Sequence, residues 1–116
     1  MNKTNQQYGL HEENINKINR VFSRYKSVEE VILYGSRAKG NFRPGSDIDL
    51  TIIGKNLSLR DLNKITLELD DLLMPYTFDV SIYRHIKDPD LIDHITRVGK
   101  VFYTQYHKDN VNIDGF

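Results

Sequence analysis

Apolar residues recur three or four positions apart in three segments of the chain. These segments cover about residues 11–25, 58–74 and 88–98. Such spacing collects the apolar side chains on one face of a helix, which then packs against a core. The pattern therefore predicts three amphipathic helices.

Residues at the helix ends support these limits. Ser58 is followed three positions later by Asp61, as in a capping box. Asp88 precedes Pro89, which is a favoured order of N-cap and first helical residue. Gly99 follows the third segment and is typical of a helix end.

Four other segments are rich in β-branched and aromatic residues and predict strands. They cover residues 28–34, 47–53, 77–83 and, as a shorter last strand, 100–103. Side chains alternate between the two faces of a strand. Asp47, Asp49 and Asp79 therefore lie on the faces opposite to the apolar residues of their strands.

The positions of these acids also predict strand directions. Gly35 follows the end of the first strand, whereas Asp47 starts the second, so both reach one ligand only if the strands are antiparallel. Asp79 is near the start of its own strand, so the second and third strands are expected to be parallel. The helix over residues 58–74 provides the crossover that parallel strands require. We therefore predict an α+β fold with a mixed sheet and helices packed mainly on one face.

Composition limits the class of protein. The 116 residues suffice for one domain, and 16 basic residues balance 16 acidic ones. Bulk charge thus gives no argument for nucleic-acid or membrane binding, and we expect neither. No cysteine is present. Because no apolar run approaches the ~20 residues of a membrane span, we expect a cytoplasmic protein. We predict a domain over residues 1–104 and a polar tail over 105–116.

A small turn after the first strand is a candidate phosphate site. Glycine at Gly35 lets the backbone approach a phosphate, and the following amide groups attract its charge. Ser36 adds a hydroxyl and is expected to cap a short helix ending near Gly40. Three nearby cations, Arg37, Lys39 and Arg43, are candidates to offset a triphosphate charge.

Asp47, Asp49 and Asp79 are a candidate metal site. Clustered carboxylates repel one another unless cations are present. Oxygen ligands suit Mg²⁺ or Mn²⁺, and two such ions can activate a hydroxyl and stabilise a pyrophosphate leaving group. The four histidines, His11, His85, His94 and His107, form no metal-ligand pattern and are expected at the surface or in packing.

The complete pattern resembles the polymerase-beta-type nucleotidyltransferase superfamily. Ten residues separate Gly35-Ser36 from Asp47-Ile48-Asp49, and Asp79 lies on a later strand. The short chain and the run from Gly35 to Leu50 are similar to its minimal nucleotidyltransferase (MNT) branch. The resemblance implies that Gly35 and Ser36 bind nucleotide phosphates. It also implies that the three aspartates ligate metal and that Asp79 assists deprotonation of the acceptor.

The resemblance also implies partners. MNT proteins commonly pair with a HEPN-domain toxin and act as its antitoxin, by transferring AMP from ATP to a tyrosine of the toxin. This short chain has no room for an acceptor-binding domain, so we expect a partner to present the acceptor. Two alternatives remain open. One is a non-catalytic nucleotide-binding module that neutralises its partner by contact, and the other is a subunit of a small-molecule nucleotidyltransferase.

Overall fold

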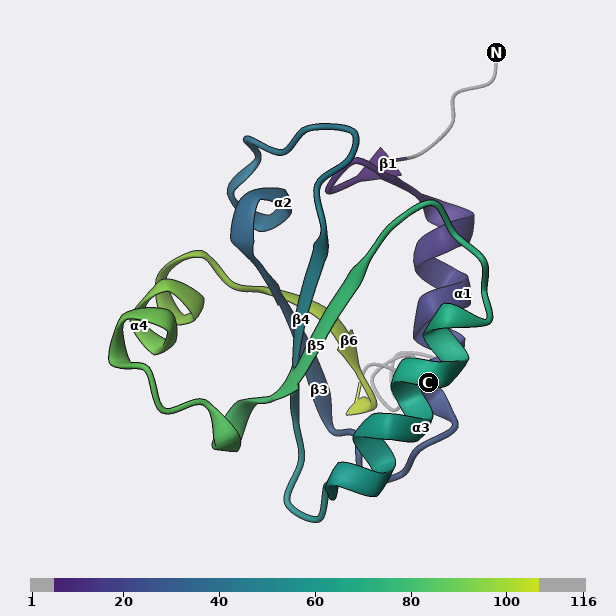
Figure 1. Ribbon diagram of the computed structural model, residues 1–116, viewed down its shortest axis with the longest axis vertical. Helices are drawn as coiled ribbons and strands as arrows, with labels where there is room; N and C mark the ends of the chain where they lie inside the picture. The colour runs from purple at the N-terminus through teal and green to yellow at the C-terminus, as the bar shows by residue number, and fades with distance from the viewer. Residues whose placement is uncertain (1–5, 107–116) are drawn as a thin grey trace, which may run out of the picture.

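A four-stranded sheet forms the centre of the protein in a computed structural model, which describes residues 6–106 (Figure 1). Its strands are β3 (Glu30–Tyr34), β4 (Ile48–Ile53), β5 (Phe78–Ile82) and β6 (Lys100–Thr104). The order across the sheet is β5-β4-β3-β6. The predicted last strand is thus present and lies at an edge.

The strand directions agree with the prediction. Strands β3 and β4 are antiparallel, with Tyr34 opposite Asp49, and β4 and β5 are parallel, with Asp49 beside Asp79. Helix α3 (Leu59–Asp70) forms the crossover between the parallel pair. This register brings three sequence-distant side chains to the same end of the sheet.

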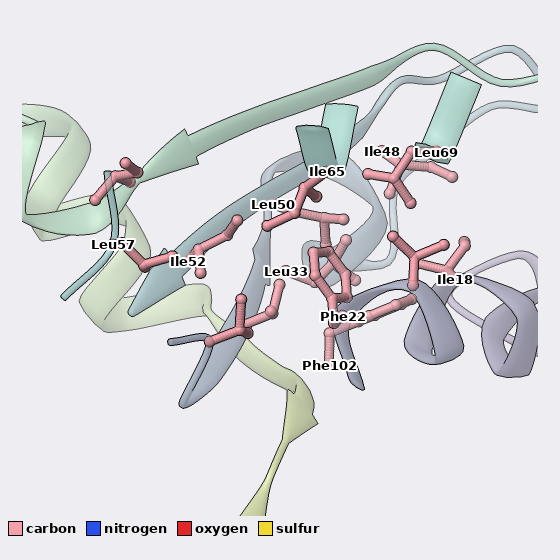
Figure 2. Close-up of a cluster of buried hydrophobic side chains, with 14 of the residues drawn as sticks. Ile18, Phe22, Leu33, Ile48, Leu50, Ile52, Leu57, Ile65, Leu69 and Phe102 are labelled. Carbon is pink, nitrogen blue, oxygen red and sulfur yellow. The ribbon is translucent and has the colours of Figure 1, made fainter. Parts of the chain in front are cut away.

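Two helices cover one face of the sheet. Helix α1 (Glu12–Ser23) and α3 lie together on one side in Figure 1. Figure 2 shows the core between them and the sheet, where apolar side chains of β4 meet those of both helices. The fully buried members include Ile18, Phe22, Ile48, Leu50, Ile52, Ile65 and Leu69. Their burial leaves the opposite face of β4 for the acidic residues.

Two shorter helices lie away from this core. Helix α2 (Gly35–Lys39) follows β3 directly, and α4 (Pro89–Val98) packs on the other side of the sheet (Figure 1). The chain passes close to β3 at Gly99, directly after α4, because a Cβ added there would lie 2.7 Å from Cγ2 of Ile32. A 3₁₀ helix, η1 (Tyr83–His85), joins β5 to α4.

The predicted helix signals are largely confirmed. Ser58 and Asp61 form the reciprocal capping box, and Asp88 accepts a hydrogen bond from the Asp90 amide. Helix α3 ends four residues earlier than Met74, the predicted end, and Leu73 beyond it has a positive φ of 55°. The prediction that Ser36 caps a helix is wrong: α2 begins one residue earlier, at Gly35.

A small hairpin at the start of the described chain was not predicted. Strands β1 (Gln6–Gln7) and β2 (Leu10–His11) are joined by Tyr8 and Gly9, both at positive φ as in a type I′ turn. Leu10 is fully buried, which fixes the hairpin to the core.

The two ends of the predicted domain are only partly described. Gln105 starts the predicted tail, and its Nε2 donates to Val28 O at 2.9 Å. The remainder of the tail, residues 107–116, lies outside the described residues, as do residues 1–5. The domain limits therefore stay a prediction.

Candidate active site

The turn between β3 and α2 lies directly against a carboxylate. Gly35 has a φ of +75°, and a Cβ added there would overlap Asp49 Oδ2. The register explains the contact, because Tyr34, the preceding residue, is paired with Asp49. The predicted phosphate turn and one predicted metal ligand are therefore in direct contact, and a side chain at position 35 would displace the carboxylate.

The three predicted aspartates act on one another electrostatically. Asp49 is partly buried, whereas Asp47 and Asp79 are exposed. Burial raises the pKa of Asp49, and the charges of Asp79 and then Asp47 raise it further. Asp49 and Asp79 thus lie side by side on the face opposite to the core, and Asp47 is close enough for its charge to act on Asp49.

Tyr34 lies opposite Asp49 in the pairing of β3 with β4 and was not predicted as a site residue. Burial raises the pKa of the Tyr34 phenol, and the charges of Asp79 and Asp49 raise it further, while a hydrogen bond with Ser81 acts in the opposite direction. Ser81 Oγ also donates to Thr51 Oγ1 at 3.0 Å. The sheet surface next to Asp49 and Asp79 is therefore polar, and its side chains form hydrogen bonds with one another. Tyr34 could have been predicted as a neighbour of the site, because the alternation of side chains along a strand places it on the same face as Asp49.

His94, on α4, also contacts the turn. The Gly35 amide donates to His94 Nε2 at 3.0 Å, and the imidazole meets the Tyr34 ring edge-on. Sequence reasoning placed this histidine at the surface or in packing. Its contact with the turn joins residues 59 positions apart, and no local pattern gives a signal for it.

The three predicted phosphate-binding cations have different surroundings. Lys39, at the end of α2, and Arg43, in the loop before β4, are both exposed. Arg37, also predicted to contact a nucleotide, is buried instead, and only 2% of the residue is exposed. Its guanidinium donates to three backbone carbonyls, those of Tyr8, Pro44 and Ser46.

Two aromatic rings complete the surroundings of Arg37. The guanidinium lies 5.4 Å from the ring centre of Phe42 and 5.0 Å from that of Tyr76. Arg37 therefore joins the N-terminal hairpin to the loop before β4. Its positive charge still lowers the pKa of Asp49, against the larger effects of burial and Asp79.

The aspartates are suited to hold a divalent cation together with the phosphates of a bound nucleotide. Within residues 6–106, no three His, Cys, Asp or Glu side chains form a ready metal cage. Mg²⁺ usually binds through one or two carboxylates together with substrate phosphates and waters, so a closed cage is not required. The fit rests on Asp49, whose pKa is raised first by burial and then by the neighbouring charges of Asp79 and Asp47. All the available donors are oxygens, as Mg²⁺ and Mn²⁺ prefer.

A family comparison identifies the fold that carries this cluster. The model of the family described as "Polymerase beta, Nucleotidyltransferase" matches residues 16–108. The chain belongs to this family. The predicted nucleotidyltransferase domain and its mixed α+β fold are thereby confirmed, and the family generally uses a divalent metal and a nucleoside triphosphate.

Solved structures show the same fold. A chain of a toxin–antitoxin complex with AMP-PNP aligns with a TM-score of 0.64 and 21% identity, covering 84% of this chain and 79% of that one. A complex of tri-AMPylated Shewanella oneidensis HEPN toxin with MNT antitoxin gives a TM-score of 0.60 and 19% identity, covering 86% and 77%. A protein solved as a candidate minimal nucleotidyltransferase gives 0.62 and 24%, covering 84% and 98%.

A comparison with curated proteins gives no significant match. No helix among residues 6–106 combines the length and apolar character needed to cross a membrane.

Substitution of Gly35 tests the contact with Asp49. We expect Gly35→Ala to lose about 1–2 kcal/mol of stability from its left-handed backbone, and to lose nucleotide binding as the methyl group displaces the carboxylate. Gly40→Ala is a matched control, because Gly40 has a φ of +93° and no atom within 4 Å of an added Cβ. Thermal melts and nucleotide titrations measure both effects. Equal nucleotide affinity in the two variants would contradict the close contact.

Asp49→Asn tests the electrostatic strain. The pKa of Asp49 is higher in the folded than in the unfolded protein, so its favourable contribution exists at low pH and is lost as pH rises through the folded pKa. We therefore expect the metal-free variant to have a higher Tm than the unsubstituted protein at pH 7. The difference should vanish below the ordinary value of 3.8, where both states are protonated.

The size of this shift is measurable by calorimetry. Each change of ~1 kcal/mol in the free energy of unfolding shifts Tm by roughly 4–8 °C for a domain of about this size. Asp70→Asn, at the exposed end of α3, is the control and should leave the Tm unchanged. A lower Tm for Asp49→Asn at pH 7 would show that the carboxylate is stabilising in the free protein.

Arg37→Ala tests whether this residue is structural. Three carbonyl acceptors would lose their donor, and we expect a loss of about 2–4 kcal/mol in the free energy of unfolding. Arg43→Ala, at an exposed position, should change stability by less than about 0.5 kcal/mol. Denaturant titration measures both. Unchanged stability with weakened nucleotide binding would instead support a direct phosphate contact for Arg37.

Proposed function

We propose that the protein is a metal-dependent nucleotidyltransferase that transfers AMP from ATP to a tyrosine hydroxyl of a HEPN-domain toxin and thereby acts as its antitoxin. One observation carries the proposal: the Asp49 carboxylate lies against the Gly35 turn and beside Asp79. A triphosphate bound at the turn would have its phosphates next to the acids that hold its cation.

Each site residue then has a chemical role. Gly35 and Ser36 bind phosphate oxygens, and exposed Lys39 and Arg43 offset the remaining negative charge. Asp47, Asp49 and Asp79 are the ligands for divalent metal, which when bound neutralises the phosphates and stabilises the leaving group.

Asp79 has a second role in the transfer. It accepts the proton of the acceptor hydroxyl as that oxygen bonds to the α-phosphorus. The bond from the α-phosphorus to the bridging oxygen breaks, and pyrophosphate leaves. The exposure of Asp79 suits this role, since the acceptor must reach it from outside.

The identity of the acceptor rests on structural neighbours. One neighbour is a chain of a complex of tri-AMPylated HEPN toxin with MNT antitoxin, and another is a chain of a toxin–antitoxin complex with AMP-PNP. The shared fold supports an equivalent pairing for this chain. A partner protein would place its tyrosine over the open acidic face of the sheet.

The test is transfer of label from α-labelled ATP to a co-purified HEPN partner in Mg²⁺. We expect Asp47→Asn to reduce the transfer rate by about 100-fold or more, because several kcal/mol of charge stabilisation is lost. Asp70→Asn is the control and should transfer normally. No label on the partner with the unsubstituted protein would contradict the proposal. Label on an added aminoglycoside would favour the small-molecule alternative.

A second candidate function is neutralisation by contact without transfer. A groove of about 760 Å³ lies between α1 and β6, away from the acids, and Val101 on this edge strand is 54% exposed. Exposed edge strands are ready surfaces for a partner chain. Under this hypothesis the Asp47→Asn/Asp49→Asn double variant still protects cells from the toxin. Loss of protection by the folded double variant would exclude it.

A further inference from the structure

We propose that His94 is a positioning residue for the Gly35 amide. In the free protein its imidazole accepts the hydrogen bond of this amide, and when nucleotide binds the amide donates to a phosphate oxygen instead. The inference rests on the proposed function, since it concerns the same turn. It adds a residue from α4 that the Gly-Ser and aspartate motifs do not include.

The first observation is the hydrogen bond itself. The Gly35 amide donates to His94 Nε2 at 3.0 Å. An amide has one hydrogen, and this one is already bound in the free protein. A phosphate oxygen can therefore use the Gly35 amide only after the imidazole has left it.

The second observation is that the imidazole is held in place. His94 is partly buried. The centroid of its ring lies 6.1 Å from that of the Tyr34 ring, and the two ring planes meet at an angle of 81°. Tyr34 precedes Gly35 and is itself paired with Asp49 across the β3–β4 ladder. The histidine therefore contacts two consecutive residues of the turn.

The hydrogen bond also defines the state of the ring. Because Nε2 accepts, the proton of a neutral imidazole is on Nδ1. In this state a hydrogen bond joins α4 to the turn, and nucleotide binding breaks that bond. The exchange replaces a neutral acceptor by a charged phosphate oxygen, which forms the stronger hydrogen bond with the amide.

Calorimetric titration of magnesium ATP into three variants tests the exchange. His94→Ala removes the competing acceptor, and we expect it to bind ATP about two- to tenfold more tightly than the unsubstituted protein. His94→Gln retains a side-chain acceptor and should return the affinity towards the original value. His85→Ala, at an exposed histidine of η1, is the matched control and should have no effect.

Nitrogen-detected NMR of the unsubstituted protein provides a second measurement that does not depend on folding of the variants. The free protein should show His94 in the Nδ1-protonated form, and saturation with magnesium ATP should shift the Nε2 resonance as its hydrogen bond is lost. Adenosine, which lacks phosphate, should leave that resonance in place.

Two results would overturn the inference. Unchanged or weaker ATP binding by folded His94→Ala would show that the imidazole does not compete with phosphate. An Nε2 resonance that ATP saturation leaves unmoved would show that the amide is not exchanged. If the unsubstituted protein binds no nucleotide, the proposed function itself fails. Normal binding with either result above overturns only the role of His94.

Discussion

The contact between the Asp49 carboxylate and the Gly35 turn is the constraint on which the site depends. It exists because position 35 has no Cβ and because β3 and β4 pair Tyr34 with Asp49. A shift of one residue in this pairing would turn Asp49 towards the core and Leu50 towards the acids. The buried apolar face of β4 opposes such a shift, so the hydrophobic core fixes the geometry of a polar site on the other side of the sheet.

The electrostatics of the site oppose the stability of the free protein. Burial and two neighbouring acids raise the pKa of Asp49, which means that the ionised form is disfavoured in the fold. The charge of Arg37 acts in the opposite direction, but its effect is smaller. A divalent cation with its phosphates would supply the missing positive charge. The protein thus keeps an unfavourable charge arrangement where its proposed chemistry needs one.

Local sequence signals predicted most of the fold because they act within a few residues. The spacing of apolar positions gave α1, α3 and α4, and the capping residues Ser58 and Asp88 marked two starts correctly. The β1–β2 hairpin was missed because each strand has two residues, too few for a periodic pattern. The end of α3 was placed too late because the apolar pattern continues to Met74, whereas the backbone turns at Leu73.

The sequence by itself determined which side chains share a face. Alternation along a strand is a local property, so the common face of Asp49 and Asp79 followed from the order of residues once the strand directions were inferred. Only the tertiary structure decided what Arg37 and His94 do. The first reaches carbonyls on both sides of its own helix, and the second reaches an amide 59 residues away. Such contacts depend on how whole elements pack, and no spacing within a single segment encodes them.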